Sequence, residues 1–244
     1  MARLPAQRGD AASGAGDRAA AALVHAYTAA GALIAFLSLR AAIAGDFRAS
    51  FAWMFVATIV DSTDGLLARR ARVRDVLPNV DGARLDDIVD YLTFVFIPIV
   101  VLNVAGDLEG PAAIPVAAVV LISSAYGFAA ADAKTSDHFF TGFPSYWNIV
   151  ALYLHAGRVS PPAVAVILLV LSALIFVRVG YVYPSKMPTL RAVTIGLGCV
   201  WGVMLALIIW SLPSAPLPLV LSSLFFPLYY FVLSLALNAR RPLR

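Results

Sequence analysis

Apolar runs long enough to cross a lipid bilayer recur along almost the whole chain, and they limit its possible folds more than any other feature. A transmembrane helix needs about 20 mostly apolar residues. Of the 244 residues, 61% are hydrophobic and only 13% are charged, which leaves little sequence for a separate soluble domain. The sequence therefore predicts an all-α integral membrane protein. The apolar windows predict eight transmembrane helices, over residues 19–44, 49–69, 86–106, 111–131, 144–157, 161–182, 191–211 and 215–238.

The polar segments predict how these helices are arranged. Residues 1–18 contain arginines but lack the apolar core of a signal peptide, so we expect a disordered cytosolic tail at 1–18 and a single transmembrane domain at 19–244. If both termini are cytosolic, only Arg40, Arg48 and Arg158 fall on the outer side, as the positive-inside rule favours. The segment 70–85 then faces the cytosol.

The net charge of +4 comes from arginines and lysines between apolar segments and at the termini. This distribution is typical of membrane orientation and does not favour a nucleic-acid partner. The alanine-rich, lysine-poor composition is typical of a bacterium, which predicts an inner-membrane location. The single cysteine, Cys199, lies in an apolar run. It excludes an intrachain disulfide, and we expect a buried thiol.

Four of the aspartates in the stretch DSTDGLLARRARVRDVLPNVDGARLDDIVD lie at helical spacings. Asp61 and Asp64 are three residues apart, and Asp86 and Asp90 are four apart, so each pair shares one face of a helix. Pro78 predicts a turn between the two helices. The four carboxylates should therefore converge between two neighbouring helices. We expect Asp81 to balance a neighbouring arginine or to cap the third predicted helix, which carries Asp86 and Asp90.

Carboxylates at this position need a compensating charge, because each costs about 2.5–3.5 kcal/mol at the centre of a membrane helix. Oxygen ligands without histidine or cysteine favour magnesium or manganese over zinc or copper. We therefore expect a site for one or two such ions near the cytosolic surface, where two ions can support displacement at phosphorus. Gly65, Ala68 and Gly82 would let a bulky ligand approach closely, and Arg69 could bind phosphate.

Two other readings of the acids remain open from the residues alone. The acids could pair with the arginines at 69–74 and only stabilise a helix end at the membrane interface. They could also form the ion pathway of a metal or proton transporter, since acids inside membranes often mark such pathways. Against transport, the acids are confined to one predicted helical hairpin.

The same residues resemble the signature of the CDP-alcohol phosphotransferase family. The matching positions are Asp61, Asp64, Gly65, Ala68, Arg69, Gly82, Asp86 and Asp90. Twelve residues separate Arg69 from Gly82, about one helical turn more than is usual in the family. This spacing resembles the bacterial phosphatidylcholine synthase branch. The stretches HAYT at 25–28, FFTGFPSYWN at 139–148 and YPS at 183–185 are also similar to that branch.

The resemblance implies a six-helix catalytic core in a homodimer that transfers the phosphatidyl group of CDP-diacylglycerol to choline and releases CMP. It implies that Mn²⁺ or Mg²⁺, as two ions, is held by Asp61, Asp64, Asp86 and Asp90, and that Asp90 is also the general base. The implied CDP-binding positions are Asp61, Asp64, Gly65, Ala68, Arg69 and Gly82. Serine or another alcohol remains an alternative acceptor.

Choline carries a quaternary ammonium, which aromatic ring faces bind well. The candidates for this site are Tyr27, Tyr146, Trp147 and Asn148, with Tyr183 as a further aromatic near a helix end. An interfacial aromatic belt is the alternative explanation for these residues. Lys186 and Arg191 could bind lipid phosphate or could simply follow the positive-inside rule.

Overall fold

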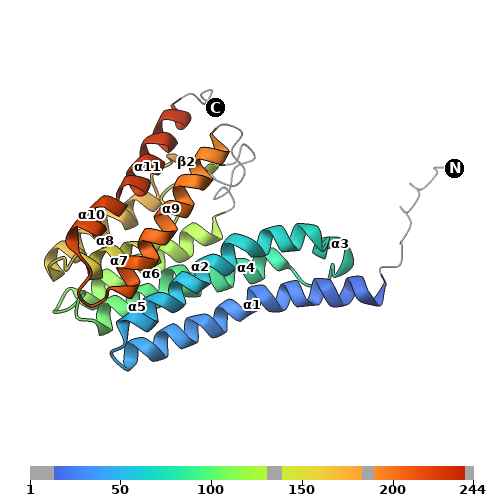
Figure 1. The fold of residues 1–244 in the computed structure, drawn as a ribbon, viewed down its shortest axis with the longest axis horizontal. Helices are drawn as coiled ribbons and strands as arrows, with labels where there is room; N and C mark the ends of the chain where they lie inside the picture. Colours follow the sequence, from blue (N-terminus) through green and yellow to red (C-terminus); the bar gives the residue numbers. More distant parts are fainter. Residues whose placement is uncertain (1–13, 131–138, 183–189, 240–244) are drawn as a thin grey trace.

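In the part of the chain that the structure describes, helices form a bundle that also contains one short pair of strands (Figure 1). The computed structural model describes residues 14–130, 139–182 and 190–239. The elements are α1 (Ala15–Ile43), α2 (Phe47–Arg70), α3 (Val73–Val76), α4 (Gly82–Asp90), the π-helix η1 (Tyr91–Phe96), α5 (Ile97–Val104), α6 (Ala113–Ala129), β1 (Phe139–Thr141), α7 (Trp147–Ala156), α8 (Pro161–Ile175), β2 (Gly180–Val182), α9 (Arg191–Trp210), α10 (Leu217–Ser223) and α11 (Phe225–Asn238). Apart from the strand pair, the predicted all-α class is confirmed.

Five helical stretches in the described part of the chain are long and apolar enough to cross a membrane. They are Ala15–Ile43, Phe47–Arg70, Gly82–Val104, Arg191–Trp210 and Leu217–Asn238. The apolar helices α6 and α8 are shorter, and α7 has 10 residues. Each predicted window contains a helix, while the number of eight membrane spans stays a prediction.

Two local features differ from the expectations. Helix α1 begins at Ala15, before the first predicted span, and residues 1–13 of the predicted tail lie outside the described residues. Cys199 is exposed on α9, so the expectation of a buried thiol is wrong. An apolar stretch in a membrane protein can place a thiol on its outer surface, because that surface is itself apolar.

The strands β1 and β2 pair antiparallel. The prediction that residues 180–182 continue a membrane helix is therefore wrong, because α8 ends at Ile175. The chain passes so close to that end that a side-chain carbon at Gly142 would lie 2.1 Å from the Ile175 carbonyl oxygen. The N–H of Phe143 donates to the Leu174 carbonyl at 3.0 Å, which satisfies an acceptor of the last turn.

Polar contacts tie four of the helix connections together at one end of the bundle. Arg48, at the start of α2, donates from Nε to the carbonyl of Leu212 at 3.0 Å. Arg158, after α7, donates to the carbonyl of Pro213 at 3.3 Å. Close by, His155 Nδ1 lies 2.6 Å from a carboxylate oxygen of Asp107, which follows α5. The start of α1 and the end of α11 both lie away from this end (Figure 1).

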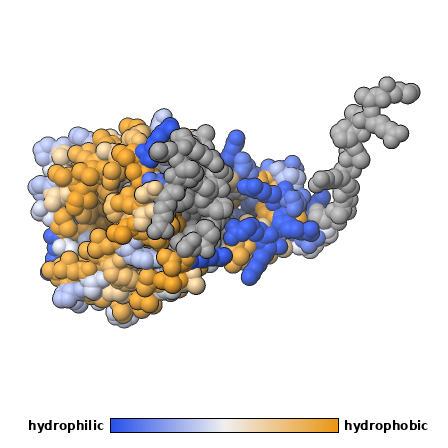
Figure 2. Space-filling view, turned by 90° about the horizontal axis from the view of Figure 1, so that it is seen from above, coloured by the Kyte–Doolittle hydropathy of each residue, from blue (hydrophilic) through white to orange (hydrophobic). Residues whose placement is uncertain are grey.

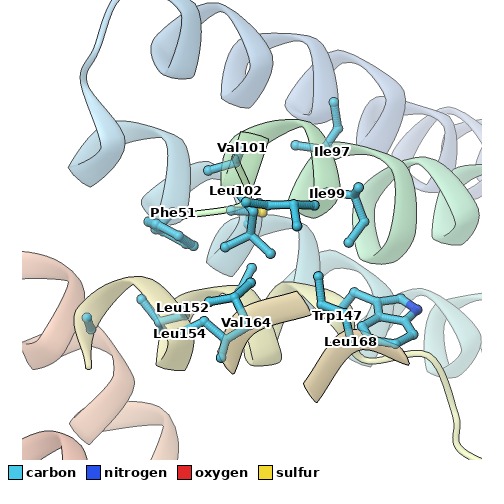
Figure 3. Close-up of a cluster of buried hydrophobic side chains, with 14 of the residues drawn as sticks. Phe51, Ile97, Ile99, Val101, Leu102, Trp147, Leu152, Leu154, Val164 and Leu168 are labelled. Carbon is cyan, nitrogen blue, oxygen red and sulfur yellow. The ribbon is translucent and has the colours of Figure 1, made fainter. Parts of the chain in front are cut away.

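The main hydrophobic core lies between α2, α5, α7 and α8. Figure 3 shows side chains from these helices pointing toward one another. Leu102 of α5 and Val164 and Leu168 of α8 are fully buried. Inside a membrane such contacts stabilise mainly through close packing, since lipid tails are as apolar as the side chains. This core holds α2 and α5 in place next to the site described below.

The two ends of the molecule differ in surface chemistry. Figure 2 shows hydrophobic residues over the body and hydrophilic residues at the narrower end. That end contains the start of α1, the end of α2 and α3 (Figure 1). Five exposed arginines belong to the segment from the last turn of α2 to the start of α4: Arg69, Arg70, Arg72, Arg74 and Arg84.

Candidate functional site

Three of the predicted acids converge between α2 and α4. Asp61, Asp86 and Asp90 are each half-buried, and one oxygen from each lies within 4.8 Å of one from each of the others. Carboxylates this close repel one another unless a cation or a proton intervenes. Two oxygens bound to the same Mg²⁺ lie at most about 4.2 Å apart, twice the ion-to-oxygen distance. The three side chains would therefore need to move only slightly toward one another for their oxygens to share one hard divalent ion.

The fourth predicted acid lies in the same pocket but not in this cluster. Asp64 is only 7% exposed, and its carboxylate accepts a hydrogen bond of 2.8 Å from the hydroxyl of Thr28 on α1. This bond satisfies a buried acid and sets its orientation. The structure therefore brings all four predicted aspartates into one pocket, and carboxylate oxygens of three of them lie within 4.8 Å of one another.

Three helical stretches line the pocket, not the two that the sequence predicts. The residues around it are Thr28 and Gly31 of α1, Ala57, Val60, Asp61 and Asp64 of α2, and Asp86, Val89, Asp90 and Thr93 of α4 and η1. The sequence reasoning assigns no role to Thr28 or Gly31. Their spacing of three residues, which places a hydroxyl and a glycine on one face of an apolar helix, is the signal that could have found them.

Gly31 allows α1 to approach α4. A side-chain carbon at this position would lie 2.4 Å from Cγ1 of Val89, a separation that real side chains do not reach. Small residues at helix crossings let backbones come close in membrane proteins. Val89 lies between Asp86 and Asp90 in sequence, so Gly31 sets how near α1 comes to the acids.

A change of helix type begins directly after Asp90. The chain continues from α4 as the π-helix η1, and Thr93 of this segment also lines the pocket. Tyr91 ties the segment to α6 by donating to the carbonyl of Leu121 at 3.0 Å. π-Helical turns are rare and occur frequently at functional sites. This one holds Asp90 and Thr93 toward the same pocket.

The start of α4 is fixed by its N-cap. Asp81 accepts hydrogen bonds from the backbone N–H groups of Ala83 and Arg84, at 3.1 and 3.2 Å. Its other oxygen lies 3.2 Å from Nε of Arg84 in an exposed pair. Both expectations for Asp81 are thus confirmed. The cap contributes about 1 kcal/mol to helix stability and sets where Asp86 begins to face the pocket.

The predicted nucleotide positions other than Asp61 and Asp64 lie within about one helical turn of an acid in sequence. A side-chain carbon at Gly65 would lie 3.4 Å from Nη1 of Arg69, so the guanidinium extends back over Gly65. Ala68 packs against a small apolar cluster that includes Ala21 of α1 and Val73 of α3. Gly82, which begins α4, lies against His25 of α1.

Two of the four choline candidates, Tyr27 and Trp147, use their side-chain polar groups in hydrogen bonds within the fold. Tyr27 shares a 2.8 Å hydrogen bond with the hydroxyl of Thr63, which links α1 to α2. Trp147 is only 1% exposed, and its indole N–H donates to Ser124 at 2.8 Å. Protein atoms therefore cover the faces of the Trp147 ring.

The other two candidates present groups that a ligand could use. Tyr146 is 37% exposed and its ring makes an edge contact with Phe94, which follows Thr93. Asn148 is 4% exposed and donates to the hydroxyl of Thr58 at 2.9 Å, while its carbonyl oxygen has no hydrogen-bond partner among the described residues. Thr58 precedes Asp61 by almost one helical turn, so Asn148 contacts the same helix, α2, that carries Asp61 and Asp64.

Of the two residues predicted to bind lipid phosphate, Lys186 and Arg191, only Arg191 is among the described residues. Arg191 is exposed at the first turn of α9. Lys186 and the aromatic candidate Tyr183 lie outside the described residues. The roles of Lys186, Arg191 and Tyr183 stay predictions.

The curated proteins compared below are all phosphatidylcholine synthases. No protein-family profile matches the sequence. The chain is 43% identical to a phosphatidylcholine synthase of Legionella pneumophila over 69% of its length, and 49% identical to that of Legionella bozemanae over 55%. These alignments span just under two thirds of the Legionella proteins, 66% and 62%. A phosphatidylcholine synthase of Pseudomonas aeruginosa is 35% identical over 86% of this chain and 87% of that protein.

Proposed function

The chain belongs to the phosphatidylcholine synthase family, and we propose that it transfers the phosphatidyl group of CDP-diacylglycerol to choline and releases CMP. The observation that carries this proposal is the approach of Asp61, Asp86 and Asp90 to within 4.8 Å of one another in the pocket that also contains Asp64. Four acids in one pocket of an apolar protein suit metal-assisted chemistry at a diphosphate.

The four aspartates would hold Mn²⁺ or Mg²⁺, as two ions, which would supply positive charge for the diphosphate and for the departing CMP. The fit rests on the donor set, since every ligand is a carboxylate and three already lie nearly close enough to share an ion. Asp64 keeps its orientation through Thr28. Partners of this kind hold metal ligands in place and often matter almost as much as the ligands.

Asp90 is the proposed general base. It would accept the proton of the choline hydroxyl while the choline oxygen forms a bond to the phosphorus that bears the diacylglycerol. The bond from that phosphorus to the oxygen of CMP breaks in the same displacement. A carboxylate suffices, because the hydroxyl needs to lose its proton only as the new bond forms. The π-helical segment after Asp90 supports this role by fixing the side chain toward the pocket.

The two substrates would approach from different parts of the pocket. Arg69, extended over Gly65, is suited to a phosphate of the CDP group. For choline we favour Tyr146, whose ring is exposed, and Asn148, whose carbonyl oxygen is unused within the described structure. Tyr27 stays a further candidate. The burial of Trp147 favours a packing role for its ring.

We further propose that the acids face the cytosol from a bacterial inner membrane. The arginine-rich segment 69–84 adjoins the site, whereas Arg48 and Arg158 lie at the opposite end. This orientation puts both termini in the cytosol and makes CDP-diacylglycerol and choline accessible from that side. The family resemblance adds an expected homodimer, which a mass measurement in detergent would test.

The decisive experiment measures CMP release by purified protein in detergent with CDP-diacylglycerol and Mn²⁺. Choline, serine, glycerol 3-phosphate and inositol are compared as acceptors. We expect turnover with choline alone, and a loss of at least about 100-fold for Asp90→Asn. Asp87→Asn is the matched control, because it makes the same change next to the metal face and should remain active.

Each other result has a clear meaning. Turnover with serine or another alcohol would retain the family chemistry and reject choline as the acceptor. No CMP release with any acceptor, from folded and metal-loaded protein, would reject the transferase. Metal-dependent flux across sealed vesicles would then support a transporter.

A further inference from the structure

His25 occupies the space that the absent side chain of Gly82 leaves open. A side-chain carbon at Gly82 would lie 3.0 Å from Cε1 and 3.6 Å from Nδ1 of the imidazole. The first separation is tighter than nine in ten real contacts of a side-chain β-carbon. The glycine that begins α4 therefore lets a ring on α1 lie directly against the backbone of α4.

The imidazole also carries an unused polar atom. Nε2 of His25 is buried and has no hydrogen-bond partner among the residues that the structure describes. Buried polar atoms in native proteins nearly always have a partner, and an exception needs an explanation. A bound ligand that supplies the partner is one such explanation at the edge of a substrate pocket.

The position of His25 points to the part of the substrate that it would contact. It lies one helical turn before Thr28 on the same face of α1, and Thr28 binds Asp64. Gly82 likewise lies one turn before Asp86 on α4. On α2, Ala68 is one turn beyond Asp64, and it packs in the same cluster as Val24 of α1. His25, Gly82 and Ala68 thus each lie one helical turn from the residues of the acid pocket. We call these three turns the adjacent layer.

We propose that His25 is a nucleotide-binding residue whose Nε2 hydrogen-bonds to the CDP group. Glycine at position 82 leaves the space that this imidazole occupies. The inference rests on the proposed function. With the diphosphate at the acids, the adjacent layer receives the nucleoside, which offers polar atoms on both ribose and base. Choline has only the hydroxyl that reacts, and the diacylglycerol has only ester oxygens, which accept and do not donate. A neutral imidazole can donate or accept at Nε2, so either kind of nucleotide group fits.

The test is CMP binding by purified protein in detergent with Mn²⁺, measured by calorimetry, together with KM for each substrate. His25→Ala should weaken CMP binding and raise the KM for CDP-diacylglycerol by about tenfold, the effect of one hydrogen bond. The KM for choline should stay unchanged. His25→Gln should recover part of the loss, because its amide can place a donor or acceptor near the position of Nε2.

A double-mutant cycle separates the roles of the two residues. Gly82→Ala should weaken CMP binding in the native background, because the new carbon displaces His25, and should add little in the His25→Ala background. An equal loss of CMP affinity in both backgrounds would show that Gly82 does not act by leaving space for His25. Unchanged CMP binding by folded His25→Ala and His25→Gln would overturn the inference and leave His25 a packing residue. The proposed function fails separately, if the native protein itself neither binds CMP nor releases it.

Discussion

Thr28 of α1 donates a 2.8 Å hydrogen bond to the buried carboxylate of Asp64 on α2. This contact makes α1 part of a site whose acids all come from α2 and α4. Asp64 lines the pocket beside the three convergent acids but lies outside their cluster. Its orientation therefore depends on a neighbouring helix, as is usual for residues that support a metal site.

Removal of the Thr28 hydroxyl should weaken metal activation. We expect Thr28→Val to raise the Mn²⁺ concentration for half-maximal CMP release by about 10–100-fold, the usual effect of losing a supporting partner, and Thr28→Ser to restore it. Thr63→Val is the matched control, since it removes a hydroxyl at the same helix interface that binds Tyr27 and no acid. Equal Mn²⁺ requirements in Thr28→Val and the native protein would contradict the role of this bond.

The close approach of Gly31 and Val89 predicts a rescue. Gly31→Ala should lower stability by about 1–3 kcal/mol and reduce activity, because the added carbon would meet Cγ1 of Val89 at 2.4 Å. Val89→Ala removes that atom, so the double variant should regain most of the lost stability. Thermal unfolding in detergent measures both. Additive losses in the double variant would show that the contact does not limit the position of α1.

Repulsion among the clustered acids predicts opposite effects with and without metal. In EDTA, Asp86→Asn should raise the melting temperature above that of the native protein, since it leaves two carboxyl groups where three lie close together. In saturating Mn²⁺ the native protein should gain stability by ligand binding, and Asp86→Asn should gain much less. Asp87→Asn should respond to Mn²⁺ as the native protein does. If Mn²⁺ did not change the melting temperature of the native protein, the metal site would be rejected.

The sequence predicted the acids well and their surroundings poorly, for a physical reason. Asp61, Asp86 and Asp90 are costly in a membrane and recur at helical spacings, so their convergence follows from charge and period. Thr28 and Gly31 carry no charge, and in an apolar helix they look like ordinary packing residues. Their role depends on which helix lies opposite, and hydrophobic pattern does not specify that neighbour.

The end of α8 shows a second limit of sequence reasoning. Residues 176–182 are mostly apolar, although Arg178 and Gly180 lie among them, so average hydropathy extends the helix through them. The helix in fact ends at Ile175. An earlier segment of the chain, at Gly142 and Phe143, packs on its last turn. Arg178 and Gly180 are local signals of a helix end, but they do not specify this contact, which joins segments far apart in sequence.

Tyr146 and Trp147 are neighbours in sequence, and their different burial predicts different effects on choline. Tyr146→Ala should raise the KM for choline by up to about 30-fold, the range for loss of a desolvated cation–π contact, with little change in the KM for CDP-diacylglycerol. Tyr146→Phe keeps the ring and should retain most of the affinity. Trp147→Phe is the comparison at the buried position, where it loses the hydrogen bond to Ser124 and should lower thermal stability without a specific change in the KM for choline. If Trp147→Phe raised the choline KM selectively and Tyr146→Ala did not, the cation would have to bind against a ring that the native fold covers, and the assignment of Tyr146 would be wrong.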